Sequence, residues 1–438
     1  MRQTKSIIRT FEFHDRSGIQ KYLENQAQKG WMLENLGKYR WKFRRKEPRE
    51  VHYAVVYFPE ADFLDPAPGE AEETFREFCA HGGWQLVGSN GQMQVFYSEQ
   101  ENPIPIETDP LLEVENIHRA MKKGSLPGYC LLILSALLQL WVQGMAIHNS
   151  VLQYLSHDFN LLQAVNWSLL LVMLVYHLAH YLLWYRKARR VAREQNVFLE
   201  TRSAKWLSNI LTALLALGFF GVLVTMQDRA LALCLVFSVA AVYGILALTE
   251  LVRKKMQKDG WDARTNRKTN LIITVVLVLI LRFVLAPAWV EKVEEKNRRD
   301  REAALPVTIW ELLGGDAEDY GTFFLTDQES LLLKYQQIHQ FPKGSSATNL
   351  QYELVEVKAD FLYPLCLKNL MGVPSYIENG LFQKIDPTPW GADQAWQFYE
   401  GEGGRDWYVL CYGNTILEII PTWTFTEEQI TTIAETMR

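Results

Sequence analysis

The chain has 438 residues, with 45 Lys and Arg against 50 Asp and Glu, which gives a formal net charge of −5 at pH 7. This length exceeds what one hydrophobic core organises, so we expect two or three domains. The near-neutral charge argues against nucleic acid as a partner. The hydrophobic share is 48 %, but it is concentrated in five long apolar runs between residues 127 and 290.

Residues 1–125 are expected to form a cytosolic α+β domain built from a duplicated strand-helix-strand-strand unit. A displacement of 53 residues aligns Gly30-Trp31 with Gly83-Trp84, and each pair follows a helical segment, "SGIQKYLENQAQKG" or "GEAEETFREFCAHGG". A strand-like segment precedes each helix, "SIIRTFEF" or "VHYAVVYF". Glycine after a last helical turn supplies the left-handed residue that ends a helix, and the tryptophan can then pack back on that helix. The two Gly-Trp pairs are therefore predicted to be structural.

Basic and aromatic residues alternate in the first copy, directly after its Gly-Trp pair. Because side chains alternate between the two faces of a strand, the bases share one face: Lys38, Arg40, Lys42 and Arg44. The second copy has Gln92 and Gln94 on the corresponding stripe, so the fold does not require the bases. A solvated outer face is the favoured interpretation. Binding of anionic lipid headgroups is the main alternative, and nucleic acid is a weaker one.

The N-terminal segments resemble a known bacterial family. "QKGWMLENLGKYRWKF", "YAVVYF" and "HGGWQLVGSNGQMQVFY" are similar to the family catalogued as domain of unknown function 2812. The resemblance implies a membrane protein of Gram-positive bacteria, in which such a domain precedes membrane helices, often in regulatory neighbourhoods with transcription factors of the PadR type. It implies no activity and supplies no catalytic residues.

The five apolar runs predict a five-helix transmembrane bundle, because each has about the length that a helix needs to cross a bilayer. They lie at 127–148, 161–185, 207–226, 230–252 and 271–290. Lys and Arg crowd the loops after the second and fourth runs, and basic loops stay inside. The opening segment also lacks the apolar stretch of a signal peptide. We therefore expect a multi-pass protein of the bacterial plasma membrane, with the N-terminal domain cytosolic and residues 291–438 extracytoplasmic.

A few polar residues interrupt the apolar runs. Arg282 lies 11 residues into the fifth run. It is expected to reach outward or to pair with Asp228, and the alternative is an intramembrane functional role. His177 and His180 share one helix face, so a metal or haem is conceivable. Packing is favoured for these histidines, and we expect no cofactor and no metal.

Residues 291–438 predict an acidic α+β domain, with 7 Lys or Arg against 20 Asp or Glu from residue 302 onward. "GTFFLT", "LQYELVEVKADF" and "AWQFYE" read as strands, and "WYVLCYGNTILEII" reads as a hairpin with a Gly-Asn turn. Thr426 and Gln429 predict a capping box for a terminal helix. Cys366 and Cys411 are the cysteines of this domain and would form a disulfide if the compartment is oxidising.

No catalytic signature is found in the sequence. "GEGGRD" joins two predicted strands and opens no helix, and the acids of "GGDAEDYG" lack the alternation of a calcium loop. The sequence therefore favours a sensor or regulatory protein that couples an outer domain to a cytosolic domain. Membrane lipids and other proteins are its expected partners. The alternatives are a membrane scaffold or transporter accessory subunit, and a membrane enzyme that uses Arg282.

Overall fold

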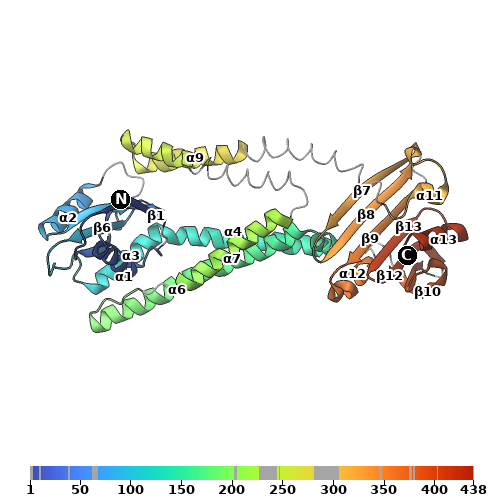
Figure 1. The fold of residues 1–438 in the computed structure, drawn as a ribbon, viewed down its shortest axis with the longest axis horizontal. Coiled ribbons are helices and arrows are strands. Elements are labelled where there is room, and N and C mark those ends of the chain that lie inside the picture. Colours follow the sequence, from blue (N-terminus) through green and yellow to red (C-terminus); the bar gives the residue numbers. More distant parts are fainter. Residues whose placement is uncertain are drawn as a thin grey trace. The chain divides into compact units, whose positions relative to one another are not determined.

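The fold comes from a computed structural model of the whole chain. It describes residues 3–8, 11–37, 40–61, 68–201, 205–225, 244–245, 247–280, 305–344, 348–373, 377, 380–401 and 403–437. The chain divides into two compact units. Unit 1 contains Met1–Leu138, Ser168–Ala216 and Leu235–Ala286, and unit 2 contains Gln139–Trp167, Leu217–Cys234 and Pro287–Arg438. The fold is mixed α/β, with two three-stranded sheets in unit 1 and a larger sheet in unit 2 (Figure 1).

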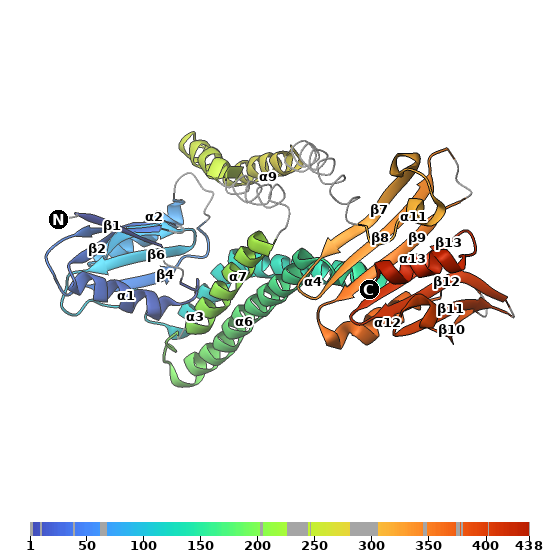
Figure 2. The same cartoon turned by 45° about the vertical axis from the view of Figure 1, so that its right-hand side comes forward.

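The two small sheets of unit 1 repeat one order of elements (Figures 1 and 2). The first copy consists of β1 (Thr4–Ile8), α1 (Arg16–Gln28), β2 (Trp31–Leu36) and β3 (Arg40–Arg45). The second copy consists of β4 (His52–Tyr57), α2 (Glu70–His81), β5 (Gln85–Asn90) and β6 (Met93–Ser98). Both sheets are antiparallel, with orders β1-β3-β2 and β4-β6-β5. The element order of each half is the one that the sequence repeat predicts.

Glycine ends both helices of the repeat as predicted. Gly30 and Gly83 have φ angles of 76° and 83°, in the left-handed region that favours glycine. Trp84 is 5 % exposed and packs with Cys79 and Phe96, and its indole donates a hydrogen bond to the Ile104 carbonyl at 2.8 Å. The second Gly-Trp pair is therefore a helix stop followed by a core anchor.

One hydrophobic core joins both copies to two later helices, α3 (Pro110–Lys123) and α6 (Asp158–Gln195). Helix α1 packs on β4 of the other copy. The side chains that α1 contributes to this core recur at helical spacing, and those that β4 contributes to it recur at every second position. The core includes Ile19, Leu23 and Ala27 of α1, Tyr53, Val55 and Tyr57 of β4, Val114, Ile117 and Met121 of α3, and Tyr181, Trp184, Ala188 and Ala192 of α6.

The predicted five-helix transmembrane bundle is wrong. Among the described residues, two helices are long and apolar enough to cross a membrane, α4 (Ser125–Asn149) and α6, whose apolar 18-residue windows have mean hydropathies of 1.9 and 1.6. Helix α7 (Lys205–Thr225) contains a shorter apolar stretch, Leu207–Gly221. Helix α9 (Ala263–Ile280) opens with the polar segment "ARTNRKTN", which leaves too few apolar residues within it. Most of the fourth predicted run and the end of the fifth lie outside the described residues.

Unit 2 contains a seven-stranded antiparallel sheet of order β10-β11-β12-β13-β9-β8-β7. Its strands are β7 (Tyr320–Glu329), β8 (Leu333–Pro342), β9 (Leu350–Val357), β10 (Gly380–Ile385), β11 (Gln394–Glu400), β12 (Gly403–Tyr412) and β13 (Thr415–Pro421). The predicted strands and the Gly-Asn hairpin are present. Most of "GEGGRD", which we expected to be a loop between two strands, belongs to β12 from Gly403 onward. Strands β8 and β10 are additions that the sequence reading lacked.

Helices cover both faces of this sheet. On one face, α11 (Ile309–Leu313) and α13 (Glu427–Thr436) pack on buried residues such as Tyr352, Leu410 and Leu417. On the other face, α5 (Val151–Leu155) and α12 (Tyr363–Leu370) pack on residues such as Tyr335 and Val355. The predicted capping box of Thr426 and Gln429 begins α13. Three short 3-10 helices complete the unit, η2 (Ala317–Asp319), η3 (Asp360–Leu362) and η4 (Thr388–Trp390).

Candidate metal-binding site

The predicted basic stripe lies on β3, where exposed Arg40, Lys42 and Arg44 alternate with buried aromatic residues. Lys38 lies outside the described residues. The neighbouring strand β2 places Glu34 against two of the bases, with an ion pair of 2.9 Å to the Lys42 ammonium and a second one to the Arg44 guanidinium. The stripe is thus partly neutralised within the domain, which agrees with the solvated-face interpretation.

The other predicted site residues do not form a site among the described residues. Arg282 and Asp228 both lie outside them. Cys366 of α12 and Cys411 of β12 are buried free thiols in the same core cluster. The disulfide between them stays a prediction that depends on an oxidising compartment. Burial raises the pKa of the Cys366 thiol to about 11 and also raises that of Cys411. These cysteines pack in the core as small apolar groups.

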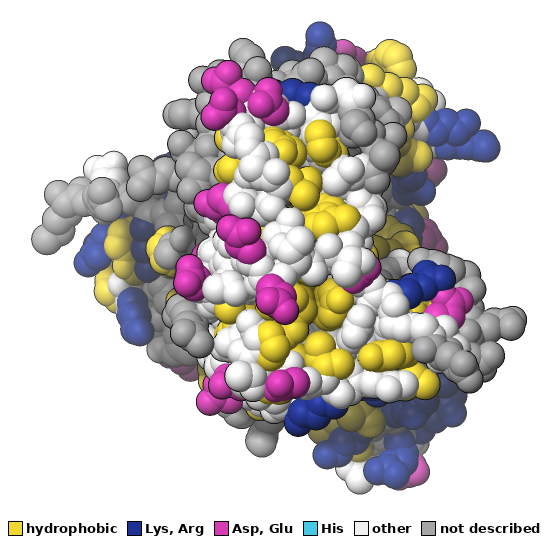
Figure 3. Space-filling view, turned by 90° about the vertical axis from the view of Figure 1, so that its right-hand side faces the viewer, with side chains coloured by type: hydrophobic (Ala, Val, Ile, Leu, Met, Phe, Trp, Pro, Cys, Tyr) yellow, Lys and Arg dark blue, Asp and Glu magenta, His cyan; other side chains and the backbone are white. Residues whose placement is uncertain are grey.

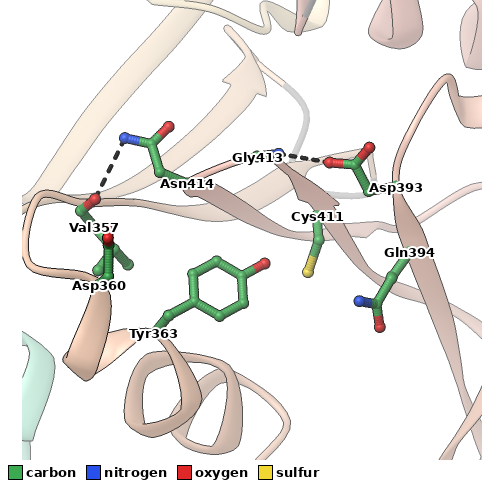
Figure 4. A pocket seen from close by; sticks show the side chains of 8 residues that line it. All are labelled: Val357, Asp360, Tyr363, Asp393, Gln394, Cys411, Gly413 and Asn414. Carbon is green, nitrogen blue, oxygen red and sulfur yellow. Dashed lines mark hydrogen bonds between the residues drawn. The ribbon is translucent and has the colours of Figure 1, made fainter.

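An open cavity of about 420 Å³ lies beside Cys411 in unit 2 (Figure 4). Two of its polar side chains bind the backbone around it. The Asp393 carboxylate accepts a hydrogen bond from the Gly413 N–H at 2.7 Å, and the Asn414 amide donates one to the Val357 carbonyl at 3.3 Å. On the face of the molecule that Figure 3 shows, the acidic side chains are spread out. These contacts give the cavity a structural explanation.

A different cluster, within unit 1, brings together polar groups from distant parts of the chain. His177 and His180 lie on α6, one helical turn apart, as the sequence predicts. The structure places Glu12 and His14 against them, from the segment between β1 and α1. The His14 ring packs on Tyr181 of α6, with a centroid distance of 5.1 Å. We call Glu12, His14, His177 and His180 the histidine–carboxylate cluster.

The segment that carries Glu12 and His14 is fixed on both sides. Asp15 caps α1 and accepts a hydrogen bond from the Gly18 N–H at 3.1 Å. The Thr201 hydroxyl, which follows α6, donates to the Asp15 carboxylate at 2.9 Å. The Tyr57 hydroxyl of β4 donates to the carbonyl of Phe13. These contacts present the side chains of residues 12 and 14 to α6 at defined positions.

The distances in the cluster separate two roles for the Glu12 carboxylate. Its Oε1 lies 3.0 Å from Nδ1 of His177, whose Nε2 lies 3.3 Å from the Ser208 hydroxyl. Its Oε2 lies 3.4 Å from Nε2 of His14 and 3.5 Å from Nδ1 of His180. Glu12 Oε2 and His180 Nδ1 are buried and make no hydrogen bond among the residues that the structure describes. One oxygen is therefore held in place, and the other faces two imidazole nitrogens without a donor.

Electrostatics in the cluster favour a neutral His14 and an ionised Glu12. Burial lowers the pKa of His14 to about 4, although the Glu12 carboxylate opposes this effect. For Glu12, burial alone would raise the pKa. The hydrogen bond with His177, with further electrostatic contributions from the neighbouring histidines, outweighs burial and holds the pKa of Glu12 below its usual range. Neutral imidazole and carboxylate are the forms of these side chains that ligate metals.

The two separations at the Glu12 carboxylate match those of ligands around one small ion. Ligand atoms of Glu12, His14 and His180 lie within 4.8 Å of one another. A tetrahedral zinc ion with bonds of about 2.0–2.1 Å holds its ligand atoms roughly 3.3–3.4 Å apart. The separations of 3.4 and 3.5 Å at Glu12 Oε2 agree with this spacing. His177 would then orient the ligating carboxylate through its other oxygen, as residues behind metal ligands commonly do.

Sequence reasoning found half of this cluster. The i, i+3 pair of His177 and His180 was visible, but no second pair of histidines stood at a matching position. Glu12 and His14 precede the pair by more than 160 residues and carry no motif beyond their own i, i+2 spacing. A buried histidine beside a carboxylate, just before a helix cap, was the signal available in "FEFHDRSG".

The fold so far defines a duplicated β-α-β-β domain that is followed by long apolar helices. Residues 15–126 match the family model described as Protein of unknown function (DUF2812), which confirms the resemblance of the N-terminal domain. No curated protein and no solved structure matches the chain. All four residues of the histidine–carboxylate cluster lie outside the matched segment, so the cluster is a feature of this chain beyond the family match.

Proposed function

We propose that this chain is a membrane-anchored regulatory protein whose N-terminal unit binds a divalent transition-metal ion through Glu12, His14 and His180. The observation that carries the proposal is the convergence of one carboxylate oxygen and two imidazole nitrogens at ligand spacing, with buried atoms that lack hydrogen bonds. Imidazole and carboxylate ligands suit zinc and its neighbours in the first transition row. Three protein ligands leave a fourth position for water or another ligand.

The exposed apolar helices support the membrane anchor. The apolar windows of α4 and α6 are only 11 % and 6 % buried within the protein, whereas the core helix of a soluble protein would be mostly buried. Side chains along α4 such as Leu134 and Trp141 are 65 % and 63 % exposed. Lipid chains would cover such helices. The proposed setting is the plasma membrane of a bacterium.

Charge supports an orientation of the proposed anchor. The last part of α6 is rich in bases, which belong on the cytosolic side of a bilayer: Arg186, Lys187, Arg189, Arg190 and Arg193. The N-terminal domain packs on this same part of α6, so it belongs on the cytosolic side. The turn between α4 and α6 then faces outward, and the sheet of unit 2 packs on that turn through α5.

The metal would act as a clamp within unit 1. Glu12 and His14 belong to the segment before α1, and His180 belongs to α6, so one ion would join the domain to a helix of the proposed anchor. An ion that binds the docked arrangement more tightly than an undocked one shifts the population toward docking. This coupling is the proposed regulatory step, in which metal occupancy determines how firmly the domain is held.

Metal titration of the full-length protein in detergent tests this proposal. After chelator treatment, Co²⁺ is added and the visible d–d absorption is followed, and Zn²⁺ binding is measured by calorimetry. We expect one ion per chain. His14→Ala and His180→Ala should each weaken binding by more than tenfold, and His177→Ala by about 10–100-fold.

His81→Ala is the matched control, because His81 is exposed on α2 and lies outside the cluster. Hydrogen exchange adds a structural readout, since Zn²⁺ should increase protection in residues 11–15 and near His180. A protein that binds no ion, or whose affinity is the same in the His14 and His180 variants as in the His81 variant, would contradict the metal site.

A further inference from the structure

The connection between α4 and α6 is built into the C-terminal sheet. Helix α4 ends at Asn149, helix α6 begins at Asp158, and the short helix α5 lies between them. Leu152 of α5 is 1 % exposed and packs in one core cluster with Cys366 and Leu370 of α12. All of these residues belong to unit 2. The sheet is therefore attached at the point where α4 ends and α6 begins.

Hydrogen bonds fix the turn after β7 at the same point. The Ser330 hydroxyl donates to the Leu155 carbonyl at 2.7 Å, and the Leu331 N–H donates to the Asp158 carboxylate at 2.9 Å. Figures 1 and 2 both draw this turn beside the chain that joins α4 to α6. The β7–β8 turn thus lies at the level of the first turn of α6.

Two large apolar side chains project from this region into solvent. Leu331, in the turn, and Phe361, in η3, are each 76 % exposed, and Leu365 of α12 is 40 % exposed. The segment before η3 is tied to the turn, because the N–H groups of Lys358 and Ala359 donate to the Leu332 carbonyl at 2.9 and 3.1 Å. We call Leu331, Phe361 and Leu365 the apolar edge.

Basic residues accompany the apolar edge, although unit 2 is acidic. From residue 302 onward the chain has 7 Lys or Arg, and three of them lie in the strand, loop and helix that form this region: Lys334, Lys358 and Lys368. Lys358 also forms an ion pair with Glu329 at the end of β7. Apolar side chains flanked by lysines are the composition of surfaces that enter the headgroup region of a bilayer. A protein partner could bind an apolar patch at any height on unit 2, whereas a bilayer requires the patch to lie at the level of the helix ends.

We propose that the apolar edge inserts into the interfacial layer of the phospholipid bilayer on the side where α4 ends and α6 begins. This inference rests on the proposed membrane anchor. The two helix ends fix the level of the bilayer surface, and the hydrogen bonds to Leu155 and Asp158 hold the edge at that level. Leu331 and Phe361 would enter to the depth of the headgroup–acyl boundary, roughly 5–10 Å. The acidic sheet would then be held at a fixed height on the membrane.

Site-directed fluorescence in vesicles tests the insertion. Cys130, which is exposed, and Cys234 are replaced by Ala in the full-length protein, which leaves the buried Cys79, Cys366 and Cys411. One accessible cysteine is then introduced at a time, as Leu331→Cys or Phe361→Cys. Each is labelled with the environment-sensitive dye NBD and reconstituted in vesicles of phosphatidylcholine and phosphatidylglycerol. We expect the emission maximum of NBD at both positions to be shifted to the blue relative to free dye in buffer. We also expect its emission to be quenched when doxyl-labelled lipid is included in the vesicles.

Two reference positions make the result decisive. Leu381→Cys is the matched control, because Leu381 is 51 % exposed on β10, at the opposite edge of the sheet from β7, and should show no lipid quenching. Leu134→Cys on α4 reports the proposed anchor itself. Quenching at 134 without quenching at 331 and 361 would overturn the inserted edge and leave the anchor standing, whereas no quenching at 134 would overturn the anchor.

A second copy of the chain is the competing occupant of the edge. In that case, labels at 331 and 361 would be shielded in detergent in a concentration-dependent way and would be insensitive to doxyl-labelled lipid. That outcome would also overturn the inserted edge. Circular dichroism and size-exclusion profiles of the variants check that these exposed positions accept the label without a change of fold.

Discussion

A buried and a half-buried glutamate face each other across the central strands of unit 2. Glu353 of β9 and Glu418 of β13 are direct partners in the antiparallel ladder, and Glu418 is 7 % exposed. The Trp407 indole donates to Glu418 at 2.6 Å, while Tyr335 and Gln337 donate to Glu353 at 2.9 and 2.7 Å. Burial, followed by the charge of Glu353, raises the pKa of Glu418 to about 8. Burial also raises the pKa of Glu353, against the hydrogen bonds from Tyr335 and Gln337.

This pair predicts a pH-dependent stability that Glu418→Gln should remove. The folded chain keeps a proton on Glu418 that the unfolded chain loses above its ordinary pKa of 4.5. The free energy of unfolding therefore falls as the pH rises from 4.5 toward 8, and it levels off above that range. The full cost is on the order of 5 kcal/mol. Glutamine still accepts the hydrogen bond from Trp407 but never ionises, so the variant should be more stable by several kcal/mol at high pH and nearly unchanged at low pH.

Hydrogen exchange of the full chain in detergent measures this effect locally, through the amides of the β12–β13 ladder. Wild-type protection, corrected for the intrinsic rate, should decrease between about pH 5 and pH 8, and that of Glu418→Gln should decrease much less, with the remaining slope due to Glu353. Glu356→Gln, on the same strand as Glu353 but outside the pair, is the control. Parallel pH profiles in wild type and Glu418→Gln would refute the reasoning, because the carboxyl would then not be the source of the slope.

Two further predictions concern the cores and helix ends. Leu23→Ala should destabilise unit 1 by about 2–5 kcal/mol, because Leu23 is fully buried between the two copies, and thermal unfolding with hydrogen exchange of α1 and β4 would measure it. Thr426→Ala should destabilise α13 by about 1 kcal/mol through loss of the capping box, with Thr431→Ala on the exposed side as its control; equal exchange of α13 in both variants would count against the cap.

Local signals made much of each sheet domain predictable from the sequence. The roles of Gly30 and Gly83 could be predicted because a helix commonly ends with a residue in the left-handed conformation, which glycine adopts most easily. The hairpin turn at Gly413 and the capping box at Thr426 are equally local. Strand β8 was missed because "LKYQQIHQFP" places polar residues on both of its faces, such as Gln336 and Gln337, so it shows no clear alternation.

Non-local features could not be predicted in this way. The five apolar runs were identified from composition alone, which does not show where a helix begins or ends. Among the described residues, the structure contains two continuous helices of sufficient length and hydropathy. The histidine–carboxylate cluster depends on how a loop before α1 meets α6. Glu12 and His180 are far apart in the chain, so no spacing rule connects them. The Glu353–Glu418 pair likewise depends on the register between β9 and β13. Sequence patterns indicate register only for two strands that a hairpin turn joins, and these two strands are not consecutive in the chain.

The N-terminal domain closes late during synthesis. Its core includes Tyr181 and Ala192 of α6, and the cap of α1 is completed by a hydrogen bond from Thr201. When residues 15–126 have left the ribosome, the hydrophobic core of the domain is therefore still incomplete, because the side chains of α6 have not yet been synthesised. In the proposed membrane setting, α4 and the apolar part of α6 would enter the bilayer before the last part of α6 packs on the domain. Cotranslational insertion would then set the order of events, with the soluble domain folding onto a helix that the membrane already holds.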